Sequence, residues 1–363
     1  METIRGVGPN LKSFFYHVCE PTDASLVRGT VVVLHGAEGH GGRYGPFGDE
    51  LVKNGYAMYS IDHVGHGLTI MDKKDDLGKW EKNDFYTAAY NAYYLVDLIK
   101  RKYPGKPVFL LGDDYGGTMA QYMIGKFENC VDGIIVASCG MPTGRDARVF
   151  LSAWLKKVCL YDGNKSKGTF RKRTAFLNSH FRPVRTKYDW LNSDPNEVDR
   201  FIADPLSGYV GTIGYYYYQY KYIMWIPRII KFKKINKNLP VLLIGGMDDY
   251  ITHRGRKIEA LKRFYVSKGF TDVDVKIYEG ARHDVLLDWN KNLVAEDIAE
   301  FINARFKTVD TKRKFKEPEE FKVITLNKIG VGPTVMPKST DASFKEEEPE
   351  DDLRLSSELK NKN

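Results

Sequence analysis

Short runs of apolar, β-branched residues alternate along the chain with longer segments whose apolar residues recur every three or four positions. The short runs are typical of buried strands, and the longer segments are typical of helices. Strands are predicted over residues 30–34, 57–62, 108–112, 133–138, 241–245 and 273–278. Helices are predicted over residues 44–55, 83–103, 116–127 and 253–269. This alternation predicts the α/β class, with a mostly parallel sheet covered by helices on both faces.

The alternation stops between residues 140 and 239, where the chain becomes aromatic and basic. We therefore expect an insertion at 140–239 that covers the carboxyl edge of the sheet as a lid. The core would then consist of an N-terminal part at 1–139 and a C-terminal part at 240–306. Residues 307–363 form charge blocks with few apolar residues. Such a segment cannot offset the entropy lost on ordering, so a largely disordered tail is predicted.

The net charge of +8 is concentrated in the insertion. The segment from Arg145 to Lys237 holds 19 lysines and arginines against 7 aspartates and glutamates. A solvated basic surface is the simpler interpretation, and attraction to acidic substrates or peripheral contact with an anionic membrane surface is the alternative. No nucleic-acid motif accompanies the charge, so we expect no nucleic-acid partner. The oligomeric state is left open.

The cysteines favour a reducing compartment. Cys19, Cys130, Cys139 and Cys159 show no metal-binding spacing, and four in a chain of 363 residues do not form a disulfide framework. The first residues hold no apolar signal-peptide core, and no window approaches 18 uninterrupted apolar residues. We expect a cytoplasmic protein. Glycine-rich stretches lack the strand-to-helix placement of phosphate loops, so no metal or organic cofactor is expected.

The stretch "LLGDDYGG" (110–117) has the layout of a nucleophile elbow, a sharp turn from a strand into a helix. Glycines on both sides of such a turn force its central side chain out over the end of the sheet. The centre here is Asp114, flanked by Gly112, Gly116 and Gly117, where such elbows usually carry serine. A glycine-bounded turn alone is a weak signal, because such turns are common.

Two downstream loops strengthen the signal. The first, "GGMDDYI", follows a strand and carries Asp248 and Asp249, and the second, "EGARHD", carries His283 after the next strand. Nucleophile, acid and histidine base follow one another in this order in hydrolases with such an elbow. An aspartate would fix the tautomer of His283, and His283 would act as the general base. Taken alone, His283 would more simply be a loop histidine.

The loop after the first predicted strand completes the candidate site. In "VVVLHGAEGHGGRY" the backbone N–H of Ala37 can lie opposite that of Tyr115. Two converging N–H donors form an oxyanion hole, which holds the negative oxygen of a tetrahedral intermediate. Without the elbow, this loop would be an ordinary glycine-rich turn.

Together, "HGAEGHGGRY", "DHVGHG", "PVFLLGDDYGG" and "YEGARHD" resemble motifs of the monoacylglycerol lipase and lysophospholipase branch of the α/β-hydrolase superfamily, also labelled serine aminopeptidase-like. The segment 181–208 is similar to a lid signature in bacterial members, and the resemblance covers about residues 25–306. It implies the α/β-hydrolase fold and hydrolysis of carboxylic esters of apolar or lipid molecules.

Carried over position by position, the resemblance assigns the nucleophile position to Asp114, the acid to Asp249 and the base to His283. The spacing of the family's acid motif after Gly246 favours Asp249 over Asp248. The oxyanion donors fall on Ala37 and Tyr115.

The departures from the family pattern are also specific. The usual histidine-serine pair is Asp113-Asp114 here, and the glutamate after the catalytic histidine is Asp284. Within the first loop, "GAEG" exchanges the usual glutamate and glycine.

An aspartate at the elbow leaves three functions open. An ester hydrolase would be impaired, because the tetrahedral adduct expels the aspartate more readily than an alkoxide. A second possibility is an aspartate nucleophile that attacks an epoxide, with a lid tyrosine as the acid. The candidate tyrosines are Tyr215, Tyr216, Tyr217, Tyr218, Tyr220 and Tyr222. The third possibility is a catalytically inactive protein that binds a lipid or a partner.

Overall fold

The computed structural model describes residues 1–8, 13–70, 76–229 and 235–306. The charged tail predicted at 307–363 lies outside these residues. No helix in the described ranges is long and apolar enough to span a membrane.

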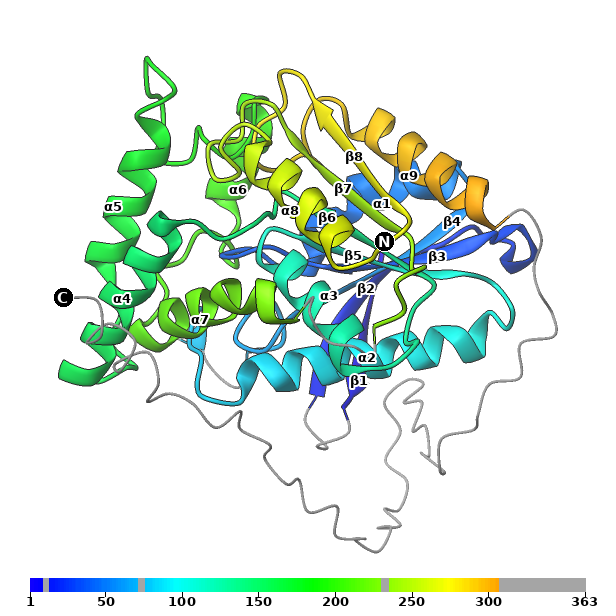
Figure 1. Ribbon diagram of the computed structural model, residues 1–363, viewed down its shortest axis with the longest axis horizontal. Helices are drawn as coiled ribbons and strands as arrows, with labels where there is room; N and C mark the ends of the chain where they lie inside the picture. Colours follow the sequence, from blue (N-terminus) through cyan, green and yellow to red (C-terminus); the bar gives the residue numbers. More distant parts are fainter. Residues whose placement is uncertain (9–12, 71–75, 230–234, 307–363) are drawn as a thin grey trace, which may run out of the picture. The chain divides into compact units, whose positions relative to one another are not determined.

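The described residues form an eight-stranded sheet with the order β1-β2-β4-β3-β5-β6-β7-β8 (Figure 1). β1 and β2 pair antiparallel, as do β2 and β4, and the other neighbours are parallel. All six predicted strands occur in this sheet, which confirms the predicted α/β class. The strands are β1 (Glu2–Val7), β2 (Ser13–Cys19), β3 (Gly29–Leu34), β4 (Tyr56–Ile61), β5 (Val108–Asp113), β6 (Gly133–Ala137), β7 (Val241–Gly246) and β8 (Val273–Tyr278).

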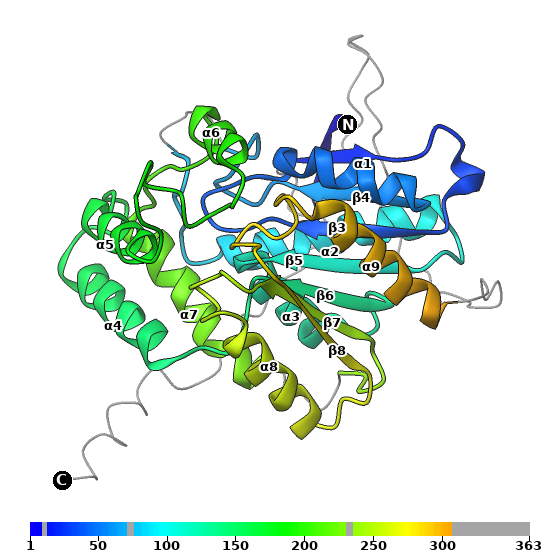
Figure 2. The ribbon, with the colours of Figure 1, turned by 90° about the horizontal axis from the view of Figure 1, so that it is seen from above.

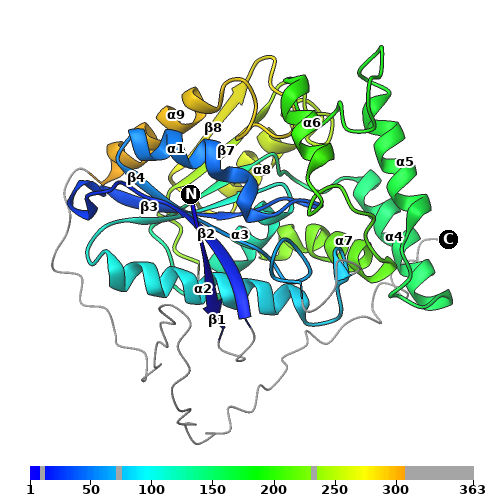
Figure 3. The same cartoon turned by 180° about the vertical axis from the view of Figure 1, so that it is seen from behind.

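Two layers of helices bury the sheet. Side chains alternate along β3, because Val32 and Leu34 join the apolar cluster on one face while Val31 and Val33 join the cluster on the other. Figure 3 shows α1 and α9 on one side and α2 on the other. The helices around the sheet are α1 (Gly45–Lys53), α2 (Asp84–Lys102), α3 (Tyr115–Lys126), α8 (Arg256–Ser267) and α9 (Lys291–Arg305), with short 3-10 helices at Ala24–Leu26 and Gly41–Tyr44.

The hairpin β1–β2 and helix α9 are absent from the sequence-based prediction. β1 is mostly exposed, so its side chains show no regular alternation of apolar and polar residues. It is a strand because its backbone pairs with β2, from Glu2 opposite Val18 to Val7 opposite Ser13. Such pairing between separate segments is invisible to a local pattern.

In the described residues between β6 and β7, four helices lie within the predicted insertion at 140–239. They are α4 (Gly144–Cys159), α5 (Lys167–Asn178), α6 (Pro195–Ala203) and α7 (Ile213–Ile229). α7 packs against both α3 and α4, and α4 and α5 lie beyond the carboxyl ends of the parallel strands (Figure 2). The insertion therefore stands over the edge where the loops after β3, β5, β7 and β8 meet.

Candidate active site

The turn from β5 into α3 holds Asp114 in a strained backbone conformation, with φ 47° and ψ −111°. Its glycines permit close contacts between backbones. A Cβ on Gly112 would lie 2.2 Å from the carbonyl oxygen of Gly116, and one on Gly116 would lie 2.0 Å from that of Leu34. Because larger residues cannot occupy these positions, the turn presents the Asp114 side chain at the end of the sheet.

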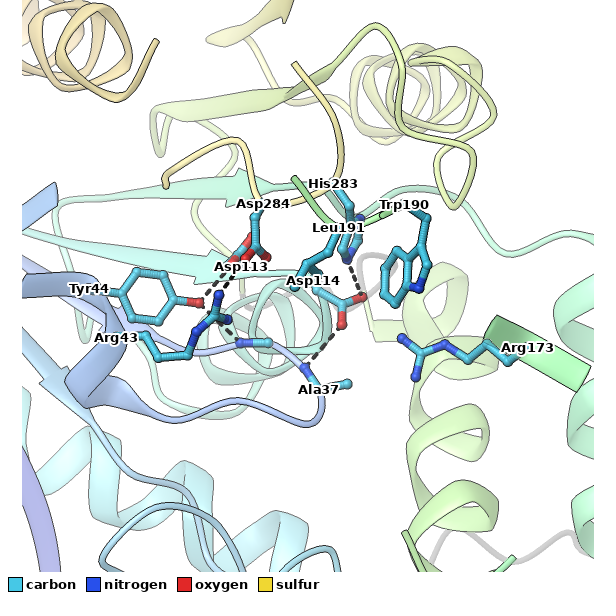
Figure 4. A pocket seen from close by; sticks show the side chains of 11 residues that line it. Ala37, Arg43, Tyr44, Asp113, Asp114, Arg173, Trp190, Leu191, His283 and Asp284 are labelled. Atoms are coloured by element: carbon cyan, nitrogen blue, oxygen red, sulfur yellow. Dashed lines mark hydrogen bonds and ion pairs between the residues drawn. The ribbon is translucent and has the colours of Figure 1, made fainter. Parts of the chain in front are cut away.

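Asp114 contacts two of the residues that the sequence analysis selected (Figure 4). The N–H of Ala37 donates to its Oδ2 at 3.0 Å, and Nε2 of His283 lies 3.7 Å from its Oδ1. Tyr115 is the first residue of α3, so its N–H belongs to the donors that have no acceptor within the helix. Oδ2 of Asp114, an oxygen that a serine would lack, therefore accepts the hydrogen bond of the Ala37 N–H, one of the two expected oxyanion donors.

The buried carboxylate of Asp249 contacts the other side of the His283 ring. Its Oδ2 lies 3.1 Å from His283 Nδ1. Asp249 also accepts hydrogen bonds from the N–H of Ile251 at 2.8 Å and the hydroxyl of Thr252 at 2.9 Å. Asp248 instead lies 3.6 Å from Arg254 at the surface. The fold therefore brings Asp114, His283 and Asp249 into one line and leaves Asp248 outside it.

The charges around Asp114, His283 and Asp249 favour an ion pair between His283 and Asp114. Burial opposes the charge of His283, but the carboxylates of Asp249 and Asp114 outweigh it and raise the His283 pKa well above its usual value. Burial likewise opposes the charge of Asp114, yet His283, Arg173 and the Ala37 N–H together lower the Asp114 pKa. A His283 with a raised pKa would carry a proton on Nε2 and could donate it to a group beside Asp114.

Beside this pair, two carboxyl groups replace the family's histidine and glutamate. Asp113 accepts from the hydroxyl of Tyr44 at 2.7 Å, and Asp284 accepts from Arg43 at 2.6 Å. Oδ1 of Asp113 is buried without a hydrogen-bond partner among the described residues. Burial and the neighbouring Asp284 raise the Asp113 pKa to about 7. A cavity of about 10 Å³ adjoins this cluster and His283.

A larger cavity of about 420 Å³ is also lined by Asp114. Its walls come from α4, α5, α7 and the loops after β6 and β7. Apolar lining is provided by Val149, Phe176, Leu177, Ile223 and Ile251. Asp114 therefore lines a space large enough for a small amphiphilic ligand.

Of the six tyrosines proposed as a lid acid, Tyr220 is the one that lines this cavity. Burial raises its pKa to about 12. Tyr216 instead contacts Glu38 at 3.3 Å, and Tyr222 stacks on Phe85 with ring centroids 3.7 Å apart. Most tyrosines of this helix therefore serve to pack it against the rest of the protein.

Two residues near the site were missed from the sequence. Arg173 of α5 forms an ion pair with the buried Glu38 at 2.7 Å and faces Asp114, and Trp190 packs on the His283 ring with centroids 5.4 Å apart. The exchange of glutamate and glycine in "GAEG" is the sequence feature that could have pointed to Glu38, whose backbone φ is positive at 59°. Nothing local links that loop to a helix 135 residues later.

One group in the described part of the chain has the residue types and spacing of metal ligands. His17, His40 and Asp62 place ligand atoms within 4.8 Å of one another. These atoms are already hydrogen-bonded: His17 Nε2 to Asp62 at 3.2 Å, and His40 Nε2 to Asp204 at 2.7 Å. The cluster joins the N-terminal hairpin to the loops above the sheet.

Comparisons with known proteins show the family and the fold of the chain. The family model described as "Serine aminopeptidase, S33" matches residues 25–290. Human monoglyceride lipase is 26% identical over 260 residues, which cover 70% of this chain and 74% of the human protein.

Two solved structures show the same α/β-hydrolase fold. A thermostable carboxyl esterase from Bacillus coagulans, in complex with glycerol, has a TM-score of 0.73 at 23% identity over 84% of this chain and 98% of its own. A soluble variant of monoglyceride lipase from Saccharomyces cerevisiae, in complex with a substrate analog, has a TM-score of 0.65 at 20% identity, covering 80% and 92% of the two chains.

Proposed function

The chain belongs to the serine aminopeptidase S33 family, and from this premise we propose that it hydrolyses carboxylic esters of lipids with Asp114 in place of serine. One observation carries the proposal. His283 lies between Asp249 and Asp114, while the Ala37 N–H reaches the same Asp114 carboxylate. These contacts support the proposal, because ester hydrolysis needs a nucleophile, a proton carrier, an orienting acid and an oxyanion donor close together.

The reaction follows from the ion pair. Oδ1 of Asp114 attacks the ester carbonyl carbon, and collapse of the adduct breaks the bond to the alcohol oxygen, which takes the Nε2 proton of His283. A mixed anhydride and neutral His283 remain. Water then gives a proton to His283, its oxygen bonds to the acyl carbon, and the bond to Asp114 breaks. The products are the fatty acid, the alcohol and the original ion pair.

Two features of the site slow this reaction. The first adduct expels the Asp114 carboxylate more readily than the alcohol, so most adducts revert. Oδ2 of Asp114 also competes with the substrate oxygen for the Ala37 N–H. The proposed activity is therefore slow compared with that of a serine at the same position.

A second candidate function rests on Tyr220. This hydroxyl lines the cavity that Asp114 also lines. Attack of Asp114 on an epoxide carbon would break the carbon–oxygen bond, and the released oxygen would take the Tyr220 proton. Water would then hydrolyse the alkyl ester of Asp114, releasing the diol and the Asp114 carboxylate, and the remaining proton of that water would return to the Tyr220 oxygen.

We expect the purified chain to release laurate from 1-monolauroylglycerol, and His283→Ala to reduce the rate at least about tenfold, since positioned proton transfer contributes this much or more. Styrene oxide is assayed in parallel, with Tyr220→Phe as the variant for that route. Epoxide opening that depends on Tyr220, without laurate release, would favour the second candidate. Equal laurate release by the parent and His283→Ala would contradict the ester proposal. Absence of turnover with both substrates would favour an inactive binding protein.

The outer face of α4 suits contact with a membrane surface. Leu151, Trp154, Leu155 and Val158 recur at three- and four-residue spacing and are 53%, 42%, 49% and 67% exposed. Such an apolar stripe on a basic helix can enter the headgroup region of an anionic bilayer. We propose that α4 holds the protein at the lipid surface from which the ester is taken.

Sedimentation with phosphatidylserine-containing vesicles tests this contact. Leu155→Glu with Val158→Glu should lower the partition coefficient at least about tenfold, because two apolar side chains lose their burial and two negative charges are added. Leu26→Glu with Val266→Glu is the matched control, since both residues are exposed apolar side chains outside α4. Unchanged binding of the α4 variant would exclude this face.

A further inference from the structure

The large cavity beside Asp114 carries an excess of positive charge. Six lysines and arginines line it against two aspartates, an excess of four charges. The cations are Arg145, Arg148, Lys156, Lys172, Arg173 and Lys257, and the aspartates are Asp114 and Asp146. Arg145, Arg148 and Lys156 come from α4, Lys172 and Arg173 from α5, and Lys257 from α8. The inner face of α4 and the facing side of α5 are therefore basic.

Two of the six cations are neutralised by carboxylates of the protein. Arg173 pairs with Glu38 at 2.7 Å, and Lys257 pairs with Asp146 at 3.0 Å. Arg173 also faces Asp114.

The other four cations have no carboxylate partner among the described residues. Lys156 donates to the hydroxyl of Thr169 at 2.6 Å, and Arg148 donates to the carbonyl of Gly144 at 3.3 Å. Arg145 lies over the ring of Phe176, 3.2 Å from its centroid. Burial and the adjacent Lys172 lower the pKa of Lys156. Arg145 and Lys156 are thus partly desolvated, and cations close together, such as Lys156 and Lys172, are stabilised when an anion enters between them.

The same cavity is also lined by the apolar residues Val149, Leu177, Ile223 and Ile251. A ligand that contacts both the apolar and the basic residues has an alkyl part and an anionic part. A neutral glycerol headgroup would leave the four unpaired cations without a counter-charge. Four cations match a dianionic phosphate better than a monoanionic carboxylate, because a phosphate offers more charge and more acceptor oxygens.

We propose that this cavity binds a monoacyl lipid whose alcohol carries a phosphate group, with Arg145, Arg148, Lys156 and Lys172 around the phosphate and the ester toward Asp114. This rests on the proposed function, because it names the alcohol half of the ester that Asp114 would attack. Binding itself requires no turnover, so the two proposals can fail separately.

The test compares ligands that share one acyl chain. Binding of 1-lauroylglycerol 3-phosphate, 1-monolauroylglycerol, laurate and glycerol 3-phosphate to the full chain is measured by calorimetry below the micelle concentration. The phosphate lipid should bind at least about tenfold more tightly than the neutral lipid, as expected for charge-assisted hydrogen bonds. This preference should shrink as salt is added, because the outer cations are open to solvent.

Lys156→Gln with Lys172→Gln should weaken binding of the phosphate lipid about tenfold and change binding of the neutral lipid less than about twofold. The matched control is Lys167→Gln with Arg171→Gln, which removes the same charge from exposed positions of α5 outside the cavity. This control should leave both affinities within about twofold of the parent. Thermal melting of both variants verifies that they fold.

The outcomes separate the two proposals. Equal affinity for the phosphate and neutral lipids, or equal losses in the two double variants, would overturn the phosphate assignment. If laurate binds as tightly as the phosphate lipid, the cations recognise a carboxylate and the phosphate assignment is overturned. If glycerol 3-phosphate binds as tightly, the acyl chain contributes nothing to binding and the proposal of a lipid ligand is overturned. Tight, Lys156-dependent binding of the phosphate lipid without laurate release would support this inference while refuting the proposed hydrolysis.

Discussion

Replacement of Asp114 with serine should raise the hydrolysis of 1-monolauroylglycerol at least about 100-fold. A serine hydroxyl has no second oxygen, so the N–H of Ala37, which now donates to Asp114 Oδ2 at 3.0 Å, becomes available to the substrate. The loss of a single oxyanion donor costs about 100- to 1000-fold in comparable sites. The acyl-enzyme would also become an ordinary ester, which removes the reversal that limits an aspartate nucleophile.

The same substitution changes the role of His283. Its raised pKa depends on two carboxylates, and Asp114→Ser leaves only that of Asp249. The His283 pKa should therefore fall, and the neutral imidazole could take the serine proton. Activity of the variant should rise with pH through this lowered pKa, because the unprotonated form is the base.

The measurements are kcat/KM with 1-monolauroylglycerol and labelling by a fluorophosphonate, which reacts with activated serines. Asp114→Asn is the control, since it removes the charge without adding a nucleophile. Asp114→Ser combined with His283→Ala should lose both activity and labelling. If Asp114→Ser is neither active nor labelled, then the oxyanion donors or Asp249 do not act as their positions suggest.

Replacement of Asp113 with asparagine should stabilise the protein above pH 7, by at most about 4 kcal/mol, and have little effect near pH 4. Burial and Asp284 raise the Asp113 pKa from its ordinary value of 3.8 to about 7. The folded state therefore holds this proton more tightly than the unfolded state does. As pH rises from about 4 to about 7, unfolding releases the proton and the parent loses stability, and above pH 7 the full loss is present.

Urea unfolding at pH 5 and pH 8 measures this difference. Asparagine is neutral at both values and keeps an oxygen that can accept the Tyr44 hydroxyl, so the gain over the parent should be larger at pH 8. Asp49→Asn, at an exposed position of α1, is the control and should shift stability little at either pH. Parallel behaviour of the parent and Asp113→Asn would show that Asp113 does not retain its proton in the folded state.

Local patterns were enough to predict the central architecture. The runs at 30–34 and 108–112 and the glycines around Asp114 place a strand-to-helix turn without knowledge of distant contacts, because steric limits on the backbone act between neighbouring residues. The order of Asp114, Asp249 and His283 was likewise readable, since parallel strands carry their loops to one edge. Their catalytic roles stay a prediction.

Distant contacts decided what the site can do. Sequence spacing could not show that Asp114 Oδ2 reaches the N–H of Ala37, 77 residues away, or that Arg173 faces Asp114 and pairs with Glu38. The strand β1 was hidden for the same reason, because its stability comes from pairing with β2. The basic residues of 145–237 were visible as a charge excess, but only the packing of α4 and α5 turns some of them into a cavity. Charge and hydrogen bonding depend on distance and burial, and the tertiary structure sets both.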